Sequence, residues 1–168
     1  MSSIKKLFSR ARFLALTALA LGIAPSLAQA QAANLSFFPV SPCRLWDTRG
    51  AIGPSGGPAH NANTARNFPV RGVCGVPTTA QAIAVNLTVT FGTLPIRDVG
   101  NMRAYPAGTG VPTSSVLNWL ATDSALANGA IIPLGDDGSG NHIRIQIDMP
   151  AGSNGQIHSL ADVTGYFQ

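Results

Sequence analysis

The sequence has 168 residues, of which 45% are hydrophobic and 11% are charged, and its formal net charge is +4. The whole excess comes from basic residues near the N-terminus, namely Lys5, Lys6, Arg10 and Arg12. The rest of the chain balances seven arginines against seven aspartates and contains neither lysine nor glutamate. This balance excludes a nucleic-acid surface, which needs clustered positive charge, and the hydrophobic content excludes a disordered chain.

Residues 1–30 have the pattern of a secretory signal peptide. Four basic residues precede an apolar run at 13–24, and the small residues around Ala28 and Ala30 form an A-x-A cleavage site. The apolar run is shorter than the ~20 residues that span a bilayer, which disfavours the alternative of a membrane anchor. We expect cleavage after Ala30, with Ala32 as the alternative, and export of residues 31–168 as one periplasmic or extracellular domain without a membrane span.

The stretch SPCRLWDTRG contains a cysteine, two arginines, an aspartate and a tryptophan. An extended backbone would place Leu45, Asp47 and Arg49 on one face and Trp46 on the other. Asp47 and Arg49 would each meet an opposite charge on a neighbouring strand, because guanidinium pairs well with carboxylate. We interpret Arg44, Asp47 and Arg49 as a structural latch. The alternative is a binding site for a sugar or an anion, with Trp46 as its platform.

Both cysteines, Cys43 and Cys74, lie in the exported part of the chain. Disulfides form and persist in oxidising compartments, so we expect one bridge between them rather than two free or metal-binding thiols. In the chain-entropy model, closing a loop of about 32 residues contributes roughly 3–4 kcal/mol.

Apolar residues alternate with polar ones along most of the exported chain. The pattern is clearest at 82–91 and 142–149, where every second residue is apolar; these residues are aliphatic except for the last of each stretch, Phe91 and Met149. This period of two indicates half-buried strands. Shorter candidate strands occupy 35–40, 43–48, 67–70, 101–106, 115–120, 130–134, 155–163 and 165–167.

Turns rich in glycine and proline separate these candidate strands, as in all-β sandwiches and barrels. The sequence therefore predicts a single-domain antiparallel β-sandwich of jelly-roll or immunoglobulin-like type, with one disulfide. One segment, 118–130, is a candidate for helix, and its Gly129 and small polar residues limit it to a turn or two.

The segment GDDGSGN at 135–141 contains weak candidate calcium ligands in Asp136, Asp137 and Asn141. Calcium takes six or more oxygens, and this segment lacks the alternating acidic spacing and the closing glutamate of a calcium loop. A glycine-rich turn between two strands explains it with fewer assumptions. The three histidines are too scattered for a metal motif: His60, His142 and His158. We therefore expect no metal and no cofactor.

Three aromatic residues are candidates for a carbohydrate-binding face, since flat rings pack against sugars: Trp46, Trp119 and Tyr105. Aromatic side chains in a small sandwich are more often part of the core. Near the C-terminus, we expect Tyr166 to anchor the last strand through a hydrogen bond from its hydroxyl to the backbone, as a further part of the latch.

Several motifs occur together in a fixed order: PCRLWDTR, AIAVNLTVT, YPAGTGVPTSSVLNW, ALANGAIIPLG and ADVTGYF. This series resembles a family of secreted bacterial β-domains with a P-x-R-x-x-D-T-R start and a D-V-x-G-Y-F end. The resemblance covers about residues 37–167. It implies export and a β-sandwich, in extracellular domains that occur alone or appended to larger secreted and surface proteins. The function of these domains is not characterised, so the resemblance implies no catalytic residues.

We expect a non-catalytic domain that acts in extracellular or envelope interaction, through adhesion or by binding a glycan or another envelope component. A binding module predicts that one of the three candidate aromatics is exposed beside polar groups. The first alternative, a purely structural or self-assembling surface protein, predicts buried aromatics and a free strand edge.

The second alternative is a secreted hydrolase. It needs a cleft where several acids and histidines converge, with Asp47, Asp98, Asp123, His142 and His158 as candidates. The sequence has no glutamate, and no two acids are spaced as a glycosidase pair. We therefore do not expect an enzyme.

Overall fold

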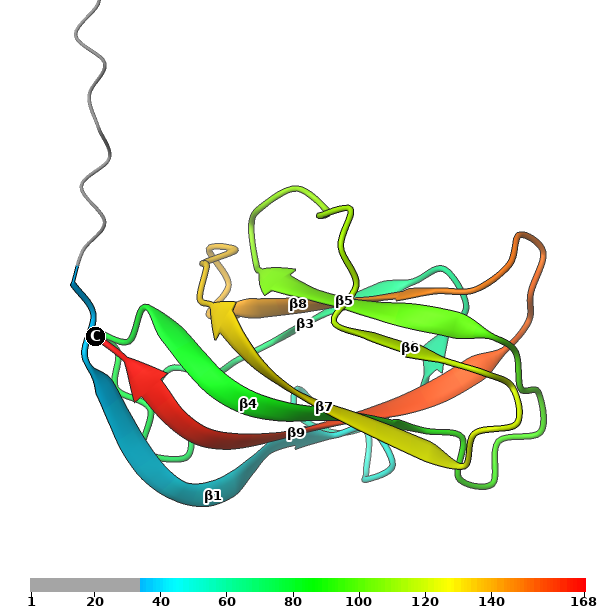
Figure 1. The fold of residues 1–168 in the computed structure, drawn as a ribbon, viewed down its shortest axis with the longest axis horizontal. Coiled ribbons are helices and arrows are strands. Elements are labelled where there is room, and N and C mark those ends of the chain that lie inside the picture. Colours follow the sequence, from blue (N-terminus) through cyan, green and yellow to red (C-terminus); the bar gives the residue numbers. More distant parts are fainter. Residues whose placement is uncertain (1–33) are drawn as a thin grey trace, which may run out of the picture. The chain divides into compact units, whose positions relative to one another are not determined.

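The computed structural model describes residues 34–168, so the expected signal peptide and its cleavage site lie outside the described residues. Strands, turns and loops make up this part of the chain (Figure 1). In chain order the strands are β1 (Phe37–Asp47), β2 (His60–Asn61), β3 (Ala65–Phe68), β4 (Ala82–Thr90), β5 (Gly100–Pro106), β6 (Leu117–Trp119), β7 (Ala125–Pro133), β8 (Ile143–Asp148) and β9 (Gln156–Phe167). No helix within residues 34–168 is long and apolar enough to cross a membrane.

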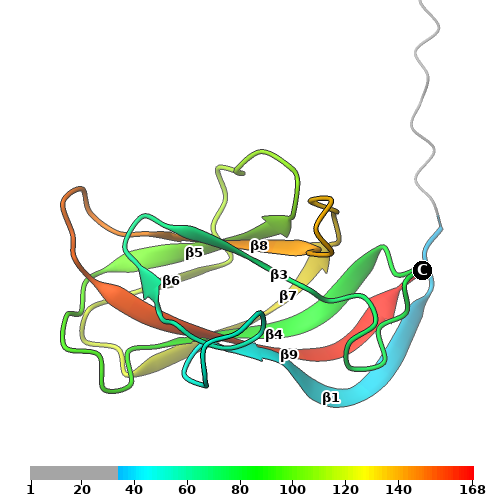
Figure 2. The same cartoon turned by 180° about the vertical axis from the view of Figure 1, so that it is seen from behind.

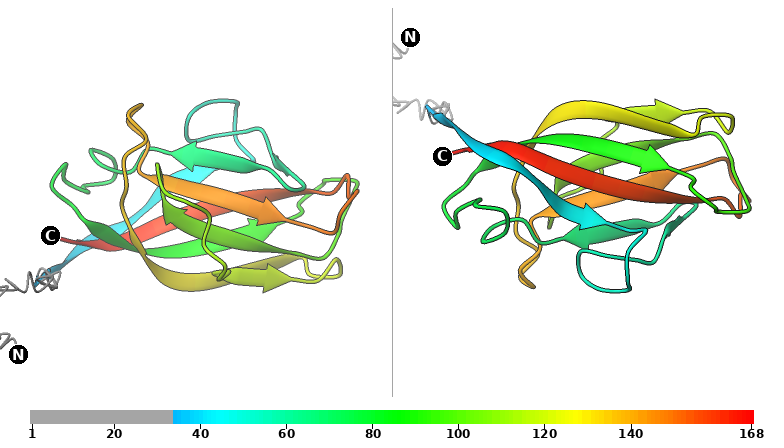
Figure 3. Two further views of the ribbon diagram at one scale, coloured as in Figure 1. Left: turned by 90° about the horizontal axis from the view of Figure 1, so that it is seen from above. Right: turned by 90° about the horizontal axis from the view of Figure 1, so that it is seen from below.

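Two antiparallel sheets pack face to face as a sandwich (Figures 1 and 2). One sheet has the order β1-β9-β4-β7, with the short β2 also paired to β9, and the other has the order β3-β8-β5-β6. Figure 3 shows the second sheet from above and the first from below. The predicted all-β sandwich is confirmed.

The core lies between the sheets and is built from the alternating positions of the two clearest strands. Ile83, Leu87 and Ile145 are fully buried, and their polar neighbours point away from the core. Each buried aliphatic side chain contributes about 1.5–3 kcal/mol to folding by leaving water. The period of two therefore predicts the inner face of β4 and β8 correctly.

Strand β1 departs from strict alternation. Leu45 and Trp46 are consecutive residues, yet both are buried, whereas the sequence predicts that they face opposite ways. The register of β1 against β9 shifts between Arg44 and Trp46, which is the effect of a β-bulge. The bulge turns the tryptophan ring into the core.

The candidate helical segment at 118–130 forms no helix, because it holds the end of β6, a turn and the start of β7. Strand β7 pairs with β4 over nine residues, from Thr90↔Ala125 to Ala82↔Pro133. This ladder satisfies the backbone of a segment whose alanines and leucine would also suit a helix. Within residues 34–168, β7 has β4 as its only hydrogen-bonded neighbour strand, so its other edge forms no ladder, although Asn128 of β7 donates through its side chain to the carbonyl of Val116 at 2.7 Å.

The first and last described strands lie side by side. β1 and β9 pair from Phe37↔Phe167 to Asp47↔Leu160, and the backbones of Ser36 and Gln168 exchange two hydrogen bonds of 2.8 and 3.2 Å. The chain therefore enters and leaves this sandwich at the same end (Figure 1).

The predicted disulfide between Cys43 and Cys74 is confirmed. Cys43 belongs to β1, and Cys74 lies in the loop that follows β3, so the bridge joins the edge of one sheet to the loop leaving the other. Both half-cystines pack against the core.

Replacing both Cys43 and Cys74 with serine should lower the free energy of unfolding by about 3–4 kcal/mol, because the unfolded chain then loses a covalent loop. Urea unfolding of the variant and the parent protein measures this difference. In parallel, titration of the denatured, unreduced protein should find no free thiol. Two titratable thiols would contradict the bridge.

Candidate functional site

The charged residues at the end of β1 form one network. Arg44 binds Asp162 on β9 through two contacts, Nε to Oδ1 at 2.5 Å and Nη2 to Oδ2 at 3.0 Å. Its Nη1 also donates to Asp47 at 2.8 Å, and Arg49 donates to the same carboxylate at 2.6 and 2.9 Å. The hydrogen bonds from Arg49 are the main reason that the pKa of Asp47 is lowered to about 2.

The network differs in one respect from the predicted pairing. Asp47 and Arg49 were expected to meet charges on a neighbouring strand, but they pair with each other, and Arg44 alone reaches across to β9. The turn after Asp47 allows this short-range pair, because the chain leaves the strand there. Arg44, Asp47 and Arg49 thus form ion pairs with one another or with Asp162.

Tyr166 contacts the opposite strand through its ring. It stacks on Phe38 of β1 with a centroid distance of 5.2 Å. Within residues 34–168 its hydroxyl has no hydrogen bond to the backbone, so the expected contact is absent and aromatic stacking joins the strands instead.

Trp46 is the centre of a buried polar cluster. Its ring stacks on Phe68 at 4.3 Å, and its Nε1 donates to Ser159 Oγ at 3.1 Å. The same Oγ lies 2.8 Å from His60 Nε2. The pKa of His60 is lowered to about 4, first by burial and then by the charge of Arg66, so the ring is neutral at pH 7.

The geometry of this cluster indicates a structural role. Ser159 is 0% exposed and already accepts the tryptophan N–H, so no substrate reaches its hydroxyl although a histidine lies beside it. Trp46 itself is 1% exposed, which removes it as a platform for a ligand.

The remaining candidate aromatics are also buried, Tyr105 and Trp119 both at 3% exposure. Trp119 differs from the other two because its indole lies at the end of the sandwich, beside a surface cavity. Its Nε1 donates to the carbonyl of Asp98 at 2.9 Å. A side chain at Gly100 would come within 2.6 Å of Trp119 Cζ2, so only glycine permits this packing.

The weak calcium candidates are occupied by other interactions. The Asp137 carboxylate accepts hydrogen bonds from the backbone of Ser139 and Asn141 and from the amides of Asn141 and Asn67, which together lower its pKa. Asp136 caps the backbone N–H of Gly138 at 2.7 Å. A carboxylate that accepts four N–H donors from its own loop and a neighbouring strand stabilises a glycine-rich turn, which the composition of 135–141 also indicates. No cluster of metal-binding side chains occurs in the described chain.

The acids and histidines proposed for a hydrolase are dispersed. Asp123 lines the cavity near Trp119, whereas His142 accepts the backbone N–H of Val70 at 3.0 Å beneath the other end of the sheet. His158 lies 3.2 Å from Thr48 Oγ1, beside the latch. Both histidines thus lie away from the cavity that Asp123 lines.

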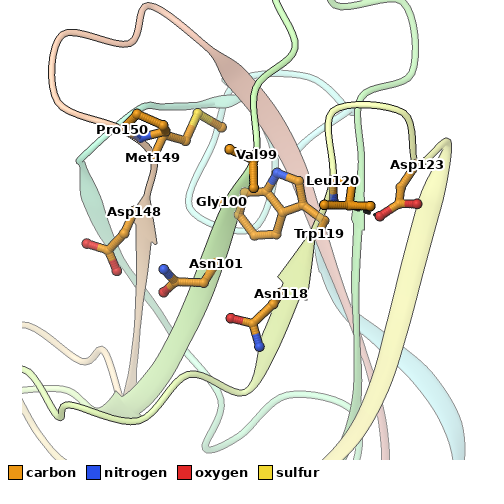
Figure 4. Close-up of a pocket in the computed structure, with 10 residues that line it drawn as sticks. All are labelled: Val99, Gly100, Asn101, Asn118, Trp119, Leu120, Asp123, Asp148, Met149 and Pro150. Carbon is orange, nitrogen blue, oxygen red and sulfur yellow. Dashed lines mark hydrogen bonds between the residues drawn. The ribbon is translucent and has the colours of Figure 1, made fainter.

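The cavity beside Trp119 has a volume of about 470 Å³. Figure 4 shows its polar wall, where Asn118, Asn101 and Asp148 lie next to one another. These three residues are direct cross-strand partners on β6, β5 and β8, so they form one row across the outer face of the four-stranded sheet. Apolar residues line the rest, among them Val99, Leu120, Met149 and Pro150.

The polar groups of this row are only partly used within the protein. Asn101 Oδ1 is buried and has no hydrogen-bond partner. Asn118 is exposed and accepts one hydrogen bond, from Ser115 at 3.0 Å. Asp148 Oδ2 lies 2.9 Å from Arg103 Nε, an ion pair without the alignment of a hydrogen bond. The row thus offers amide and carboxylate groups to a bound molecule.

The sequence does not predict this row, although its alternating pattern predicts β5, β8 and the outward direction of Asp148. The available signal is the alternation of Asn101 and Arg103 with Met102 and Ala104. That pattern marks an outer face, but it does not reveal which strands are neighbours, so it cannot place the three residues together.

No family model matches the sequence, and no curated protein matches it either. The geometry described above is therefore the basis for assigning a function.

Neutral His60 makes stability depend on pH. Its pKa is about 4 in the folded protein and near 6.5 when unfolded, so between these values the unfolded chain binds more protons and stability falls as pH falls. Between pH 7 and 4.5 this residue should account for a loss of about 2–3 kcal/mol.

His60→Gln removes the titrating group and should reduce that loss. Urea unfolding of both proteins at pH 7 and 4.5 measures the effect. Burial also lowers the pKa of His142 and His158, but both residues remain in the variant, so the difference isolates His60. Equal pH dependence in the two proteins would show that His60 is protonated without penalty.

Proposed function

We propose that this chain is a non-catalytic, exported binding module that holds a glycan in the cavity beside Trp119. The observation that carries the proposal is the row of Asn118, Asn101 and Asp148 facing an apolar wall in one cavity. Its volume of about 470 Å³ is within the range of small-ligand sites, roughly 300–1,000 Å³.

The two kinds of wall match the two kinds of surface on a sugar. Hydroxyl groups both donate and accept hydrogen bonds, and the amides of Asn101 and Asn118 can do the same, while Asp148 accepts. The C–H faces of a sugar are apolar and suit the side chains of Val99 and Leu120, which are 43% and 61% exposed. Exposed apolar side chains beside unsatisfied polar atoms are typical of a binding site.

The carboxylates of the cavity serve binding in this proposal. Asp123 Oδ2 accepts the backbone N–H of Leu120 at 2.7 Å, and Asp148 is paired with Arg103. Glycosidase chemistry needs one free acid and one free base on either side of the bond that breaks. With both carboxylates engaged, retention of a sugar is the better use of this geometry.

The expected location outside the cytoplasm has one structural support. A disulfide between Cys43 and Cys74 persists in an oxidising compartment, such as the periplasm or the extracellular space. Glycans of the cell envelope or of a host surface are abundant there, in keeping with a role in adhesion.

Asn118→Ala should weaken glycan binding about tenfold, the effect of losing one ligand hydrogen bond of roughly 1.5 kcal/mol. Asn118 is exposed, so the substitution should leave the melting temperature unchanged. The test is a glycan and cell-wall array with the exported domain, followed by titration calorimetry with the best binder.

Asn61→Ala is the matched control, because Asn61 on β2 is exposed and, like Asn118, accepts one side-chain hydrogen bond, from Gln156 at 2.8 Å, but does not line the cavity. It should bind like the parent protein. Trp119→Ala is unsuitable because it removes a core residue. Absence of binding to every glycan, with an intact fold, would refute the proposed function.

Self-association through β7 is a second candidate, supported by the free edge of this strand. The nine residues ALANGAIIP carry no charge, and Leu126 and Ile131 are 36% and 63% exposed. Natural edge strands are usually protected by charge or bulges, which β7 lacks. Two copies can pair along this edge in antiparallel fashion without charge repulsion.

Sedimentation velocity at increasing concentration tests this second candidate. The parent protein should form dimers, and Ile131→Lys should remain monomeric because a charge at the edge opposes pairing. Thr88→Lys, on the neighbouring strand β4, is the control for added charge. A monomer at all concentrations would eliminate self-association through β7.

A further inference from the structure

The charged residues that line the cavity beside Trp119 are all of one sign. They are Asp123 and Asp148, and no arginine or histidine of residues 34–168 joins them in the lining. Figure 4 shows the two carboxylates on opposite sides of the Trp119 ring. Asp148 is neutralised by its ion pair with Arg103. The net charge of the cavity wall therefore depends on Asp123.

Asp123 has no counter-charge. Within residues 34–168 it forms no ion pair, and its carboxylate accepts one hydrogen bond, from the backbone N–H of Leu120 to Oδ2 at 2.7 Å. The N–H of Asp123 donates to the carbonyl of Leu120 at 3.1 Å, so the turn holds the side chain in place. Oδ1 is left without a donor from the described chain. In a half-buried position, this oxygen attracts a positive group more strongly than it would in bulk water.

Asp98 adds a second negative charge next to the cavity. Its backbone carbonyl accepts Trp119 Nε1 at 2.9 Å, and its carboxylate accepts the N–H of Val99, a residue of the cavity wall, at 2.9 Å. Within residues 34–168 it forms no ion pair either. The neighbouring Arg97 is directed to the ring of Phe91 and to a backbone carbonyl. The cavity therefore favours a cation over an anion.

Exposed apolar groups adjoin the free oxygen of Asp123. Leu120, which is hydrogen-bonded to Asp123, is 61% exposed, and Val99 is 43% exposed. A matching ligand needs a positive group directly beside an apolar surface. A sugar with a free amino group has both, because the protonated amine is attached to a ring whose C–H faces are apolar.

We propose that the cavity selects amino sugars with a free, protonated amine, which binds to Asp123 Oδ1. This inference rests on the proposed glycan-binding function and names the class of glycan. The ammonium group donates a charge-assisted hydrogen bond to the carboxylate, and such bonds are stronger than neutral ones. The C–H face of the same ring packs against Leu120 and Val99. N-acetylation removes the positive charge, and a sugar that carries a carboxylate is repelled.

Calorimetry with oligosaccharides of equal length tests this selectivity in the exported protein. The probes are oligomers of glucosamine, of N-acetylglucosamine and of galacturonate, in a mildly acidic buffer in which the amines are protonated. The glucosamine oligomer should bind about tenfold more tightly than its N-acetylated form, the effect of one charge-assisted hydrogen bond, and galacturonate should bind most weakly. The preference should shrink as sodium chloride rises from about 0.05 M to about 0.5 M, because salt screens partly exposed charges.

Asp123→Asn removes the charge and keeps an oxygen that accepts the N–H of Leu120. It should lose about tenfold in affinity for the glucosamine oligomer, so that the preference disappears. Asp136→Asn is the matched control, because the carboxylate of Asp136 also accepts one backbone N–H at 2.7 Å, from Gly138, but does not line the cavity. It should keep the preference of the parent protein. Melting temperatures in the same buffer verify that both variants fold.

The outcomes separate the inference from the function on which it rests. Equal affinity of the parent protein for the free and the acetylated amine, tighter binding of galacturonate, or an undiminished preference in Asp123→Asn overturns the inference and leaves glycan binding intact. No binding of any oligomer or array glycan overturns both. If Asp123→Asn does not fold, the parent protein decides, since a preference that salt does not reduce also overturns the inference.

Discussion

The pairing of β9 between β1 and β4 is the constraint on which the rest of the sandwich depends. The last strand of the described chain fills the middle of its sheet, so the sheet is complete only when both ends of the chain have come together. Polar side-chain contacts join β1 and the residue after it to β9: Arg44 to Asp162, Trp46 to Ser159 and Thr48 to His158. Contacts so distant in sequence are costly to form in chain entropy, which favours a slow and cooperative assembly.

The two faces of the four-stranded sheet differ in chemistry and in role. The inner face carries Met102, Ile145 and Ile147, which bury their side chains against the other sheet. The outer face is polar, and its groups remain incompletely paired. A sheet held rigid from one side can keep such groups in fixed positions on the other, and this pre-organisation lowers the entropic cost of binding a ligand.

The sequence predicted those features that depend on local periodicity. Alternation in β4 and β8 identified the core face, and the two exported cysteines identified the bridge. The rest depends on partners that are remote in sequence. The bulge that buries Trp46 is defined against β9, and β7 is a strand because β4 supplies its hydrogen bonds. The cavity row needs the order β8-β5-β6, which no single strand encodes.

The neighbouring ends of the chain have a mechanical consequence. Tension applied at Ser36 and Gln168 would separate β1 from β9 from one end, so hydrogen bonds would break in succession rather than together. Separation would proceed from Phe37 as far as Cys43, where the covalent bond to Cys74 transfers the load past the intervening residues. The segment from 43 to 74 therefore cannot extend under force while the bridge is intact. The cavity is lined by residues at the start of β5 and the end of β6, and these two strands belong to the sheet that does not contain β1 and β9.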